Sequence, residues 1–143
     1  MADYRSAINL VLTSEGFKVG RNMGYAIIPN DNGGETIAGI ARNYWQKHPI
    51  WAIVDAAKQQ PNFPKNLVSN TKLFDLIINF YEVNFWDRIF GDNIKNQTIA
   101  NMLVDRAVNE GIVAAVKRAE EIVGLNQTGK ISDVLILKLN LLQ

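Results

Sequence analysis

The sequence predicts a mainly α-helical protein with a small β-hairpin near its amino end. Three observations lead to this fold class. Apolar residues recur at helical spacing in several segments, and a Gly/Asn-rich stretch near the amino end is typical of two short strands around a turn. The composition, with 48% apolar and 20% charged residues, is that of an ordinary globular domain. A chain of 143 residues is long enough for one such domain with its own core.

The amino-terminal part is predicted to form a helix and then a hairpin. Residues 2–15 place apolar side chains on one helix face, at Tyr4, Ile8, Val11 and Leu12. Gly16 follows as a left-handed cap. Residues 17–28 contain "FKV" and "MGYAII" around "GRN", which indicates two short strands joined by a turn.

The rest of the chain is predicted to be helical apart from its Pro- and Gly-rich breaks. The segment "PNDNGG" interrupts regular structure, and Pro49 ends a helix that begins at about Thr36 or Ile37 and reaches Lys47. The apolar stripe at 112, 115, 119 and 122 supports one of the later helices. The remaining helices are expected over residues 51–59, 70–86, 97–109, 112–123 and 131–142.

Charge and composition exclude several classes of function. The net charge is +1 and the basic residues are scattered, so no nucleic acid partner is expected. There is no cysteine, which excludes disulfides and thiol catalysis. His48 is the single histidine, so neither a metal site nor a cofactor is expected. No run approaches 18 apolar residues, and stable membrane insertion is therefore not expected.

Glu15 is the first residue whose position points to chemistry. It continues the apolar stripe of the first helix, three residues after Leu12, and therefore faces a core or a pocket. Burial and the negative end of a helix both raise a carboxyl pKa and favour the protonated form, which a general acid requires. The alternative is that the last helical turn frays and the side chain reaches water.

The segment "DNGGETIAGI" is the second candidate element. Asp31 precedes Gly33 and Gly34, which allow a tight turn that leaves the carboxylate beside a cleft. Thr36 offers a hydroxyl and a helix start. The alternative for such a run is a plain surface turn.

These residues together resemble the glycoside hydrolase family 108 muramidases, which are lysozyme-like enzymes of phages and bacteria. The family pattern is Glu-Gly-Gly-Tyr followed by Asp-x-Gly-Gly-x-Thr-x-x-Gly-Ile. This chain matches it at Glu15, Gly16, Gly24, Tyr25, Pro29, Asp31, Gly33, Gly34, Thr36, Gly39 and Ile40. Further on, "YEVNFWD" resembles the family's aromatic helix, and Asp105, Asn109 and Gly111 resemble its Asp-x-x-x-Asn-x-Gly segment.

The resemblance implies a fold and an activity. It implies a single lysozyme-like domain over 1–143, with a catalytic part at 1–90 and a carboxy-terminal helical region at 91–143 that resembles a peptidoglycan-binding segment. The implied reaction is hydrolysis of the bond between N-acetylmuramic acid and N-acetylglucosamine in peptidoglycan. The partners expected are therefore glycan strands, and the protein is expected to be monomeric.

The resemblance also implies roles for single residues. Glu15 would be the general acid, Asp31 the second carboxylate, and Thr36 a group that orients water or the nucleophile. Gly16, Gly33, Gly34 and Gly39 would shape the turns. Inverting and retaining outcomes both remain open, because they depend on the distance between the carboxyl groups.

Three further residues are candidates for substrate binding. Tyr25 and Tyr44 carry rings of the kind that stack on sugars. Asn109 either contacts a sugar, as the family motif suggests, or ends a helix before Gly111. Trp86, on an apolar helix, is expected in the core.

The chain departs from the family pattern in two places. Seven extra residues, "FKVGRNM", stand between Gly16 and Gly24, and we expect a longer hairpin that still returns Asp31 toward Glu15. Near the carboxy end only Thr128 and Ser132 keep the outline of the family's Asp-Gly turn.

Two other functions remain open beside the muramidase. A non-catalytic relative would bind peptidoglycan or serve secretion machinery, and a plain helical interaction domain would do neither. The start "MADYRSAINLVLTSEG" lacks the features of a secretory signal. We therefore expect synthesis in the cytoplasm and action on the wall or periplasm after release, as for a phage endolysin.

Overall fold

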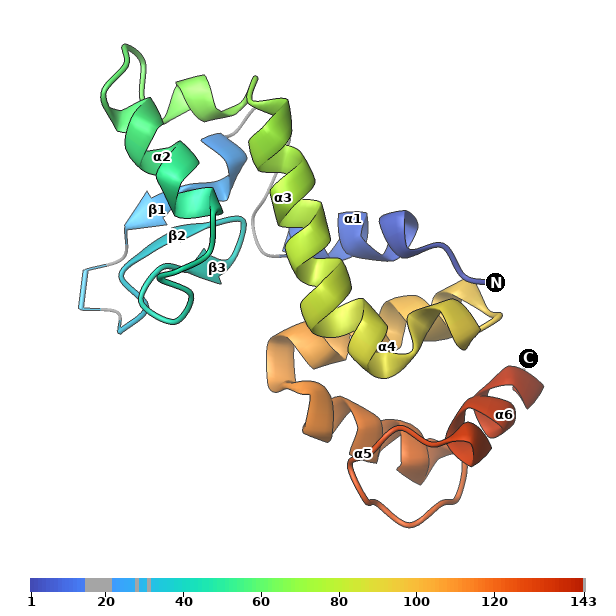
Figure 1. Cartoon of the computed structure of the whole chain (residues 1–143). Helices are drawn as coiled ribbons and strands as arrows, with labels where there is room; N and C mark the ends of the chain where they lie inside the picture. The colour runs from blue at the N-terminus through green and yellow to red at the C-terminus, as the bar shows by residue number, and fades with distance from the viewer. Residues whose placement is uncertain (15–21, 28, 31, 143) are drawn as a thin grey trace. The chain divides into compact units, whose positions relative to one another are not determined.

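The computed structural model describes residues 1–14, 22–27, 29–30 and 32–142. Within these ranges it contains six α-helices and one three-stranded antiparallel sheet (Figure 1). The mainly α, lysozyme-like fold class is thereby confirmed. Among the described helices, none is both long and apolar enough to cross a bilayer.

The chain forms two compact units. The sheet unit comprises residues 12–79, and the helical unit comprises residues 1–11 and 80–143. The chain passes from one unit to the other within helices α1 (Tyr4–Ser14) and α3 (Thr71–Tyr81). The division into a catalytic part and a peptidoglycan-binding region stays a prediction.

The sheet unit contains three short strands followed by helix α2. The strands are β1 (Ala26–Ile27), β2 (Glu35–Ile37) and β3 (Ile40–Ala41), and α2 spans Ile50–Lys58. The central strand β2 pairs with both others in antiparallel register, with Thr36 opposite Ala26 on one side and Ala41 on the other. The interior of this unit includes buried Ile37, Ile40, Trp51, Val54 and Leu67.

The helix predicted from Thr36 or Ile37 to Lys47 is wrong. Strands β2 and β3 occupy its first half, joined by a two-residue turn at Ala38 and Gly39 with φ values of 48° and 82°. Two positive φ angles in succession match the type I′ turn that fits the twist of a hairpin, and β-branched residues favour the flanking strands. Gly39 lies in the turn between β2 and β3, and Thr36 lies in strand β2 and starts no helix.

The predicted amino-terminal hairpin is half right. Its second strand exists as β1, but β1 pairs with β2, a segment that the sequence had assigned to a loop and a helix. The other expected strand, "FKV", and the cap Gly16 lie outside the described residues.

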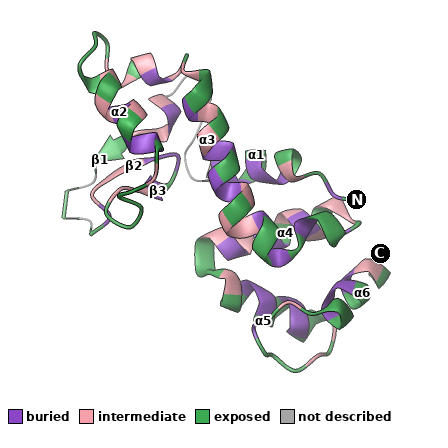
Figure 2. Ribbon diagram, in the orientation of Figure 1, coloured by how far each residue is buried: buried purple, intermediate pink, exposed green. Residues whose placement is uncertain are grey.

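The helical unit confirms the later helices that periodicity predicts. Its helices α4, α5 and α6 span Gln97–Glu110, Ile112–Ile122 and Asp133–Leu141. One face of each is buried, which is visible as the purple bands in Figure 2. The predicted stripe on α5 is buried at Ala115 and Ala119, whereas Ile122 at its end is 45% exposed.

The predicted long helix over 70–86 is confirmed, but its last five residues form a π-helix and not an α-helix. Helix α3 runs to Tyr81 and continues as a π-helical turn over Glu82–Trp86. Trp86 is fully buried, as expected, and its indole nitrogen donates a 2.9 Å hydrogen bond to Asp92. A Cβ on Gly91 would lie 2.2 Å from this ring, so the close approach needs glycine.

Side-chain caps set the start of two helices in the helical unit. Asn96 accepts a hydrogen bond from the amide of Ile99 at the start of α4, and Ser132 accepts one from Leu135 at the start of α6. Ser132 is one of the two residues that keep the outline of the family's carboxy-terminal turn. The other, Thr128, donates to the buried carboxylate of Glu120 at 2.8 Å. This eroded turn is therefore still tied to helix α5.

Replacing Asn96 by Ala should destabilise the protein by about 1 kcal/mol, because it leaves a donor in the first turn of α4 without its cap. The free energy of unfolding in urea measures this loss. The control is Gln127→Ala in an exposed loop, which should change that energy by less than about 0.5 kcal/mol. Equal values for the two variants would contradict the assigned cap.

Candidate functional site

The best-defined polar cluster of the sheet unit surrounds Glu35 on strand β2. Its carboxylate accepts hydrogen bonds from the hydroxyl of Tyr25 at 2.7 Å, from Arg42 at 2.5 Å and from Lys58 at 2.9 Å. The Glu35 side chain is 11% exposed, so this is a nearly buried anion with three donors. These donors come from the residue before β1, the residue after β3 and the last turn of α2.

A second carboxylate completes the cluster. Asp55 on α2 accepts two hydrogen bonds from Arg42, one from each terminal nitrogen and both 2.7 Å long. The guanidinium of Arg42 also lies 5.2 Å from the centre of the Trp51 ring. Bidentate pairing and stacking fix the plane of a guanidinium, which a lysine would not do. The cluster of Tyr25, Glu35, Arg42, Asp55 and Lys58 is called the Glu35 network below.

The Glu35 network fixes the position of Thr36. Strands of two or three residues have little stability of their own, so β2 depends on side-chain ties to neighbouring elements. Along β2, Glu35 and the fully buried Ile37 point to one side and Thr36 points to the other. The hydroxyl of Thr36 lies 3.4 Å from the carbonyl oxygen of Ala26. The predicted catalytic threonine thus stands on the face opposite the ion pairs that hold its strand.

A general acid needs a raised pKa, and the pKa of Glu35 is lowered, so Glu35 is not our candidate for that role. Burial opposes its ionisation, but hydrogen bonds from Lys58, Tyr25 and Arg42 outweigh this and hold the pKa of Glu35 below its usual range. Burial and the Glu35 carboxylate raise the pKa of Tyr25 to about 12. The hydrogen bonds from Arg42 likewise lower the pKa of Asp55. Both carboxylates of the network, Glu35 and Asp55, are therefore ionised at pH 7, while the Tyr25 hydroxyl keeps its proton and donates a hydrogen bond to Glu35.

This charge state makes stability depend on pH. Carboxylates whose pKa is lower when folded bind fewer protons in the folded protein than in the unfolded one, so stability is present above the unfolded pKa and is lost as pH falls. We expect the free energy of unfolding to fall as the pH drops below about 4.5. Urea unfolding at pH 7 and pH 3.5 measures the loss, and Glu35→Gln should reduce it. An unchanged unfolding energy at the two pH values would contradict these ionised carboxylates.

Two of the predicted turn glycines, Gly33 and Gly34, lie between the described Asn32 and strand β2. Gly33 is buried, and Gly34 has a φ of 72°. A Cβ on Gly34 would lie 2.8 Å from the side-chain nitrogen of Asn43, so a larger residue would push that side chain away. The turn needs glycine here for both the backbone angle and the close approach.

The two predicted catalytic carboxylates lie outside the described residues. Glu15 follows directly after Ser14, the last residue of α1, and Asp31 precedes the described Asn32. Their roles stay predictions, and so does the choice between inverting and retaining chemistry.

The predicted substrate-binding residues stand in three different settings. The Tyr25 hydroxyl belongs to the Glu35 network, and its ring meets that of Phe63 edge-on at 4.9 Å. Tyr44 is 68% exposed on the turn after β3. Asn109 lies in the last turn of α4, where its side chain donates to the carbonyl of Asp105, so it belongs to the end of a helix. Contact of any of them with a sugar stays a prediction.

His48 is half-buried. Its Nδ1 accepts a hydrogen bond from the amide of Ile50 at the start of α2, and burial lowers its pKa. In the described part of the chain, no group of three or more His, Cys, Asp or Glu side chains is arranged to hold a metal ion.

Sequence reasoning missed Glu35, Arg42, Asp55 and Lys58. Glu35 falls at a variable position of the family pattern, between Gly34 and Thr36. Asp55 and Lys58 are three residues apart on a helix, which indicates a local ion pair and nothing more. Pairing across strands and helices that are distant in sequence is what brings these residues together.

Glu82 is a described carboxyl whose pKa is raised. Burial is the main cause, and the negative charges of Asp87 and Asp92 add to it. A search for raised carboxyl pKa values alone would therefore select Glu82, in the π-helical turn after α3. It matches no position of the Glu-Gly-Gly-Tyr or Asp-x-Gly-Gly-x-Thr motifs, which makes it a useful comparison for mutagenesis.

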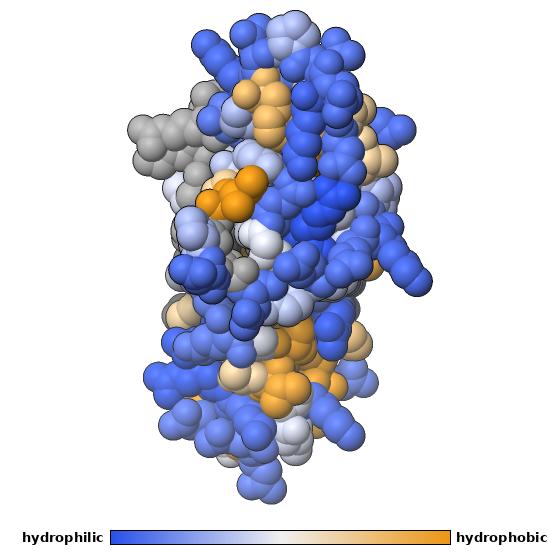
Figure 3. Space-filling view, turned by 90° about the vertical axis from the view of Figure 1, so that its left-hand side faces the viewer, coloured by the Kyte–Doolittle hydropathy of each residue, from blue (hydrophilic) through white to orange (hydrophobic). Residues whose placement is uncertain are grey.

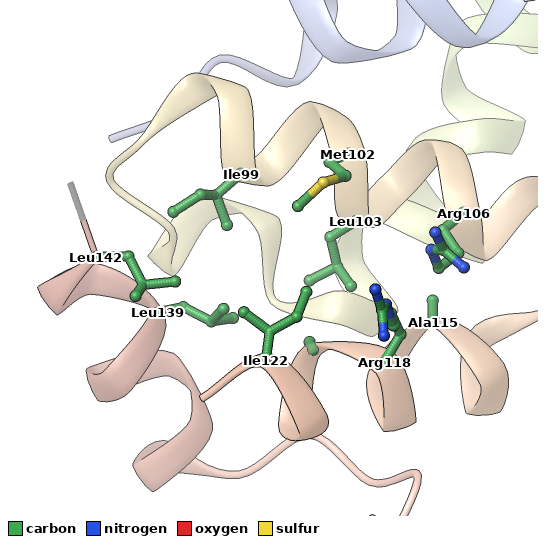
Figure 4. Close-up of a pocket in the computed structure, with 10 residues that line it drawn as sticks. Ile99, Met102, Leu103, Arg106, Ala115, Arg118, Ile122, Leu139 and Leu142 are labelled. Atoms are coloured by element: carbon green, nitrogen blue, oxygen red, sulfur yellow. The ribbon is translucent and has the colours of Figure 1, made fainter. Parts of the chain in front are cut away.

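The enclosed pocket of the helical unit lacks the groups for acid catalysis. It has a volume of about 110 Å³ and is lined mainly by apolar side chains of α4, α5 and α6 (Figure 4). Two arginines, Arg106 and Arg118, stand at one end, and no carboxyl group lines the pocket. In Figure 3 an apolar patch interrupts a mostly hydrophilic surface at the height of α4 and α5 in Figure 1. We do not assign the reaction to this pocket.

Comparison with known proteins supplies the family. The family model described as glycosyl hydrolase 108 matches residues 8–111, which is more than half of the chain. The chain belongs to the glycosyl hydrolase 108 family. The resemblance inferred from the motifs is thereby confirmed, and this family member is a glycoside hydrolase by descent.

One solved structure supports the fold of this glycosyl hydrolase 108 member. It is described as the structure of Brucella abortus SagA and has a TM-score of 0.60 to this chain. The similarity covers 98% of this chain and 70% of that chain, at 24% sequence identity. At this identity the similarity shows a common fold alone. The comparison with curated proteins gave no match.

Proposed function

We propose that the protein is a muramidase that hydrolyses the bond between N-acetylmuramic acid and N-acetylglucosamine in peptidoglycan. The observation that carries the proposal is the family match over residues 8–111, because this span contains Glu15, Asp31 and Thr36 in the motif order of the family. The Glu35 network supports it, since it holds the strand on which Thr36 stands.

Glycoside hydrolysis requires one carboxyl group that protonates the leaving oxygen and a second that activates water or stabilises the cationic transition state. Glu15 is the proposed acid. In the sequence it comes directly after Ser14, the last residue of α1, and the negative end of a helix favours the protonated form of a carboxyl group. Asp31 is the proposed second carboxylate, and Thr36 orients water or the nucleophile.

The test is incubation of the purified protein with peptidoglycan sacculi, followed by turbidity and product analysis. A muramidase releases fragments whose new reducing ends are N-acetylmuramic acid. Fragments that end in N-acetylglucosamine would overturn the proposed bond specificity. Binding to sacculi without a fall in turbidity or any released fragment would overturn catalysis and favour a non-catalytic wall-binding protein.

A further inference from the structure

The turn that follows strand β3 exposes two aromatic rings side by side in sequence. Tyr44 is 68% exposed and Trp45 is 38% exposed. Together with Asn43, Gln46, Lys47 and His48, they line an open hollow of about 390 Å³. Tyrosine and tryptophan rings have an apolar face and a polar group at the edge, so they suit ligands that also present both apolar and polar groups. Residues 43–48 are called the aromatic turn below.

The aromatic turn is tied directly to the segment that carries the predicted Asp31 and Thr36. The side-chain nitrogen of Asn43 donates to the carbonyl of Asn32 at 2.9 Å, and its backbone amide donates to the carbonyl of Gly33 at 3.0 Å. Gly34 leaves room for this side chain, because a Cβ there would collide with it. A ligand seated on the aromatic turn is therefore close to the predicted catalytic turn.

Hydrogen bonds at its other end hold the aromatic turn in shape. The carbonyl of Trp45 accepts a 3.1 Å hydrogen bond from the indole of the buried Trp51. His48 accepts from the amide of Ile50 at the start of α2. A surface that is ordered before binding loses little conformational entropy when a ligand arrives, so modest contacts are sufficient for measurable affinity.

The chemistry of the hollow fits a sugar ring of a glycan strand. One face of a pyranose presents C–H groups that pack against an aromatic ring, while hydroxyl and acetamido groups around it form hydrogen bonds. Asn43 and Gln46 supply amide groups at the edge of the hollow. None of the six residues of the aromatic turn is an acid, so no carboxylate repels the anionic parts of peptidoglycan.

We propose that the aromatic turn is a saccharide subsite in which Tyr44 and Trp45 stack on an N-acetylated pyranose of the glycan strand, next to the predicted catalytic turn. The proposal rests on the proposed function for its ligand, but it concerns binding, which is measured separately from hydrolysis. A subsite here adds affinity for the strand and positions it relative to Asn32 and Gly33, to which the aromatic turn is hydrogen-bonded.

The test is cosedimentation of Glu15→Gln protein with purified sacculi, which keeps the substrate intact during the measurement. Adding Tyr44→Ala should weaken binding about five- to ten-fold, because a stacked ring contributes on the order of 1 kcal/mol. Adding Tyr44→Phe should leave binding unchanged, because the ring remains. The control is Leu10→Ala, an exposed apolar residue on α1 at 53% that lies outside the region 91–143, and it should also leave binding unchanged.

The outcomes separate the subsite from the muramidase proposal. Equal affinity of the Tyr44→Ala and parent proteins overturns the subsite, even if the wild-type protein releases reducing ends. Equal weakening by Tyr44→Ala and Leu10→Ala also overturns it, because the effect would not be specific to the ring. Loss of binding confined to Tyr44→Ala supports the subsite, even if the wild-type protein fails to cleave sacculi. Thermal unfolding of each variant confirms that it is folded.

Discussion

Replacing Glu15 by Gln is expected to lower the rate of reducing-end release from sacculi by a factor of about 10² to 10⁴, the usual contribution of a general acid. Glutamine has nearly the same size and cannot give a proton to the leaving oxygen. The fold should be unaffected, so the variant should unfold at the same temperature as the wild type. Initial rates on purified sacculi at equal protein concentration measure the effect.

Two other carboxyl groups provide the controls for this result. Glu121 forms an exposed ion pair with Arg118, and Glu121→Gln should leave the rate unchanged. Glu82 has a raised pKa but lies outside the two motifs, so Glu82→Gln tests whether a raised pKa alone marks the acid. A large loss of activity in Glu82→Gln, with none in Glu15→Gln, would move the catalytic site to the helical unit.

Replacing Glu35 by Gln is expected to lower both stability and activity. The change removes the charge that Arg42 and Lys58 neutralise in a nearly buried site, and breaking such a pair costs about 2–3 kcal/mol of unfolding free energy. The rate should also fall by about ten- to a hundred-fold, because β2 no longer holds Thr36 in place and small displacements of catalytic groups are costly. Urea unfolding and initial rates on sacculi measure the two effects.

Two possible roles of Glu35, positioning Thr36 and stabilising the fold, can be measured separately. Rates are measured at a temperature at which circular dichroism shows the variant to be folded, so a loss of stability alone does not lower them. Under these conditions we expect kcat to fall while KM changes little, because Glu35 does not contact the substrate. Glu121→Gln is the matched control for stability. A fully active folded Glu35→Gln protein would show that the network does not position Thr36.

The helical part of the fold was predictable because each of its helices has a local sequence pattern that indicates a helix. Helices α4, α5 and α6 show apolar residues at helical spacing, and Gly111 separates the first two. The sheet was not predictable in the same way. The residues Thr36 to Lys47 contain apolar positions that also fit a helix face, and the I′ turn uses alanine at Ala38 in place of the Asn or Asp that marks such turns.

The sequence identified the motif residues of the candidate site, but it did not identify the Glu35 network that holds strand β2. The order of Glu15, Asp31, Gly34 and Thr36 indicated the family, although only the segment from Asp31 to Ile40 keeps the family spacing and Glu15 is separated from it by seven extra residues. The partners of Glu35 come from 10 residues before it and from 7 and 23 residues after it, and Asp55, which shares Arg42 with it, comes from 20 residues after it. Such contacts depend on how strands and helices pack, and no local pattern in one sequence records that.

The most direct test of the account is the pH dependence of kcat/KM for release of reducing ends from sacculi. The account predicts a rate that falls on the alkaline side, at a pH well above the ordinary glutamate pKa of about 4.3, because Glu15 must keep its proton to act. A rate that stays constant or rises from pH 5 to about pH 9 would contradict a proton-donating Glu15.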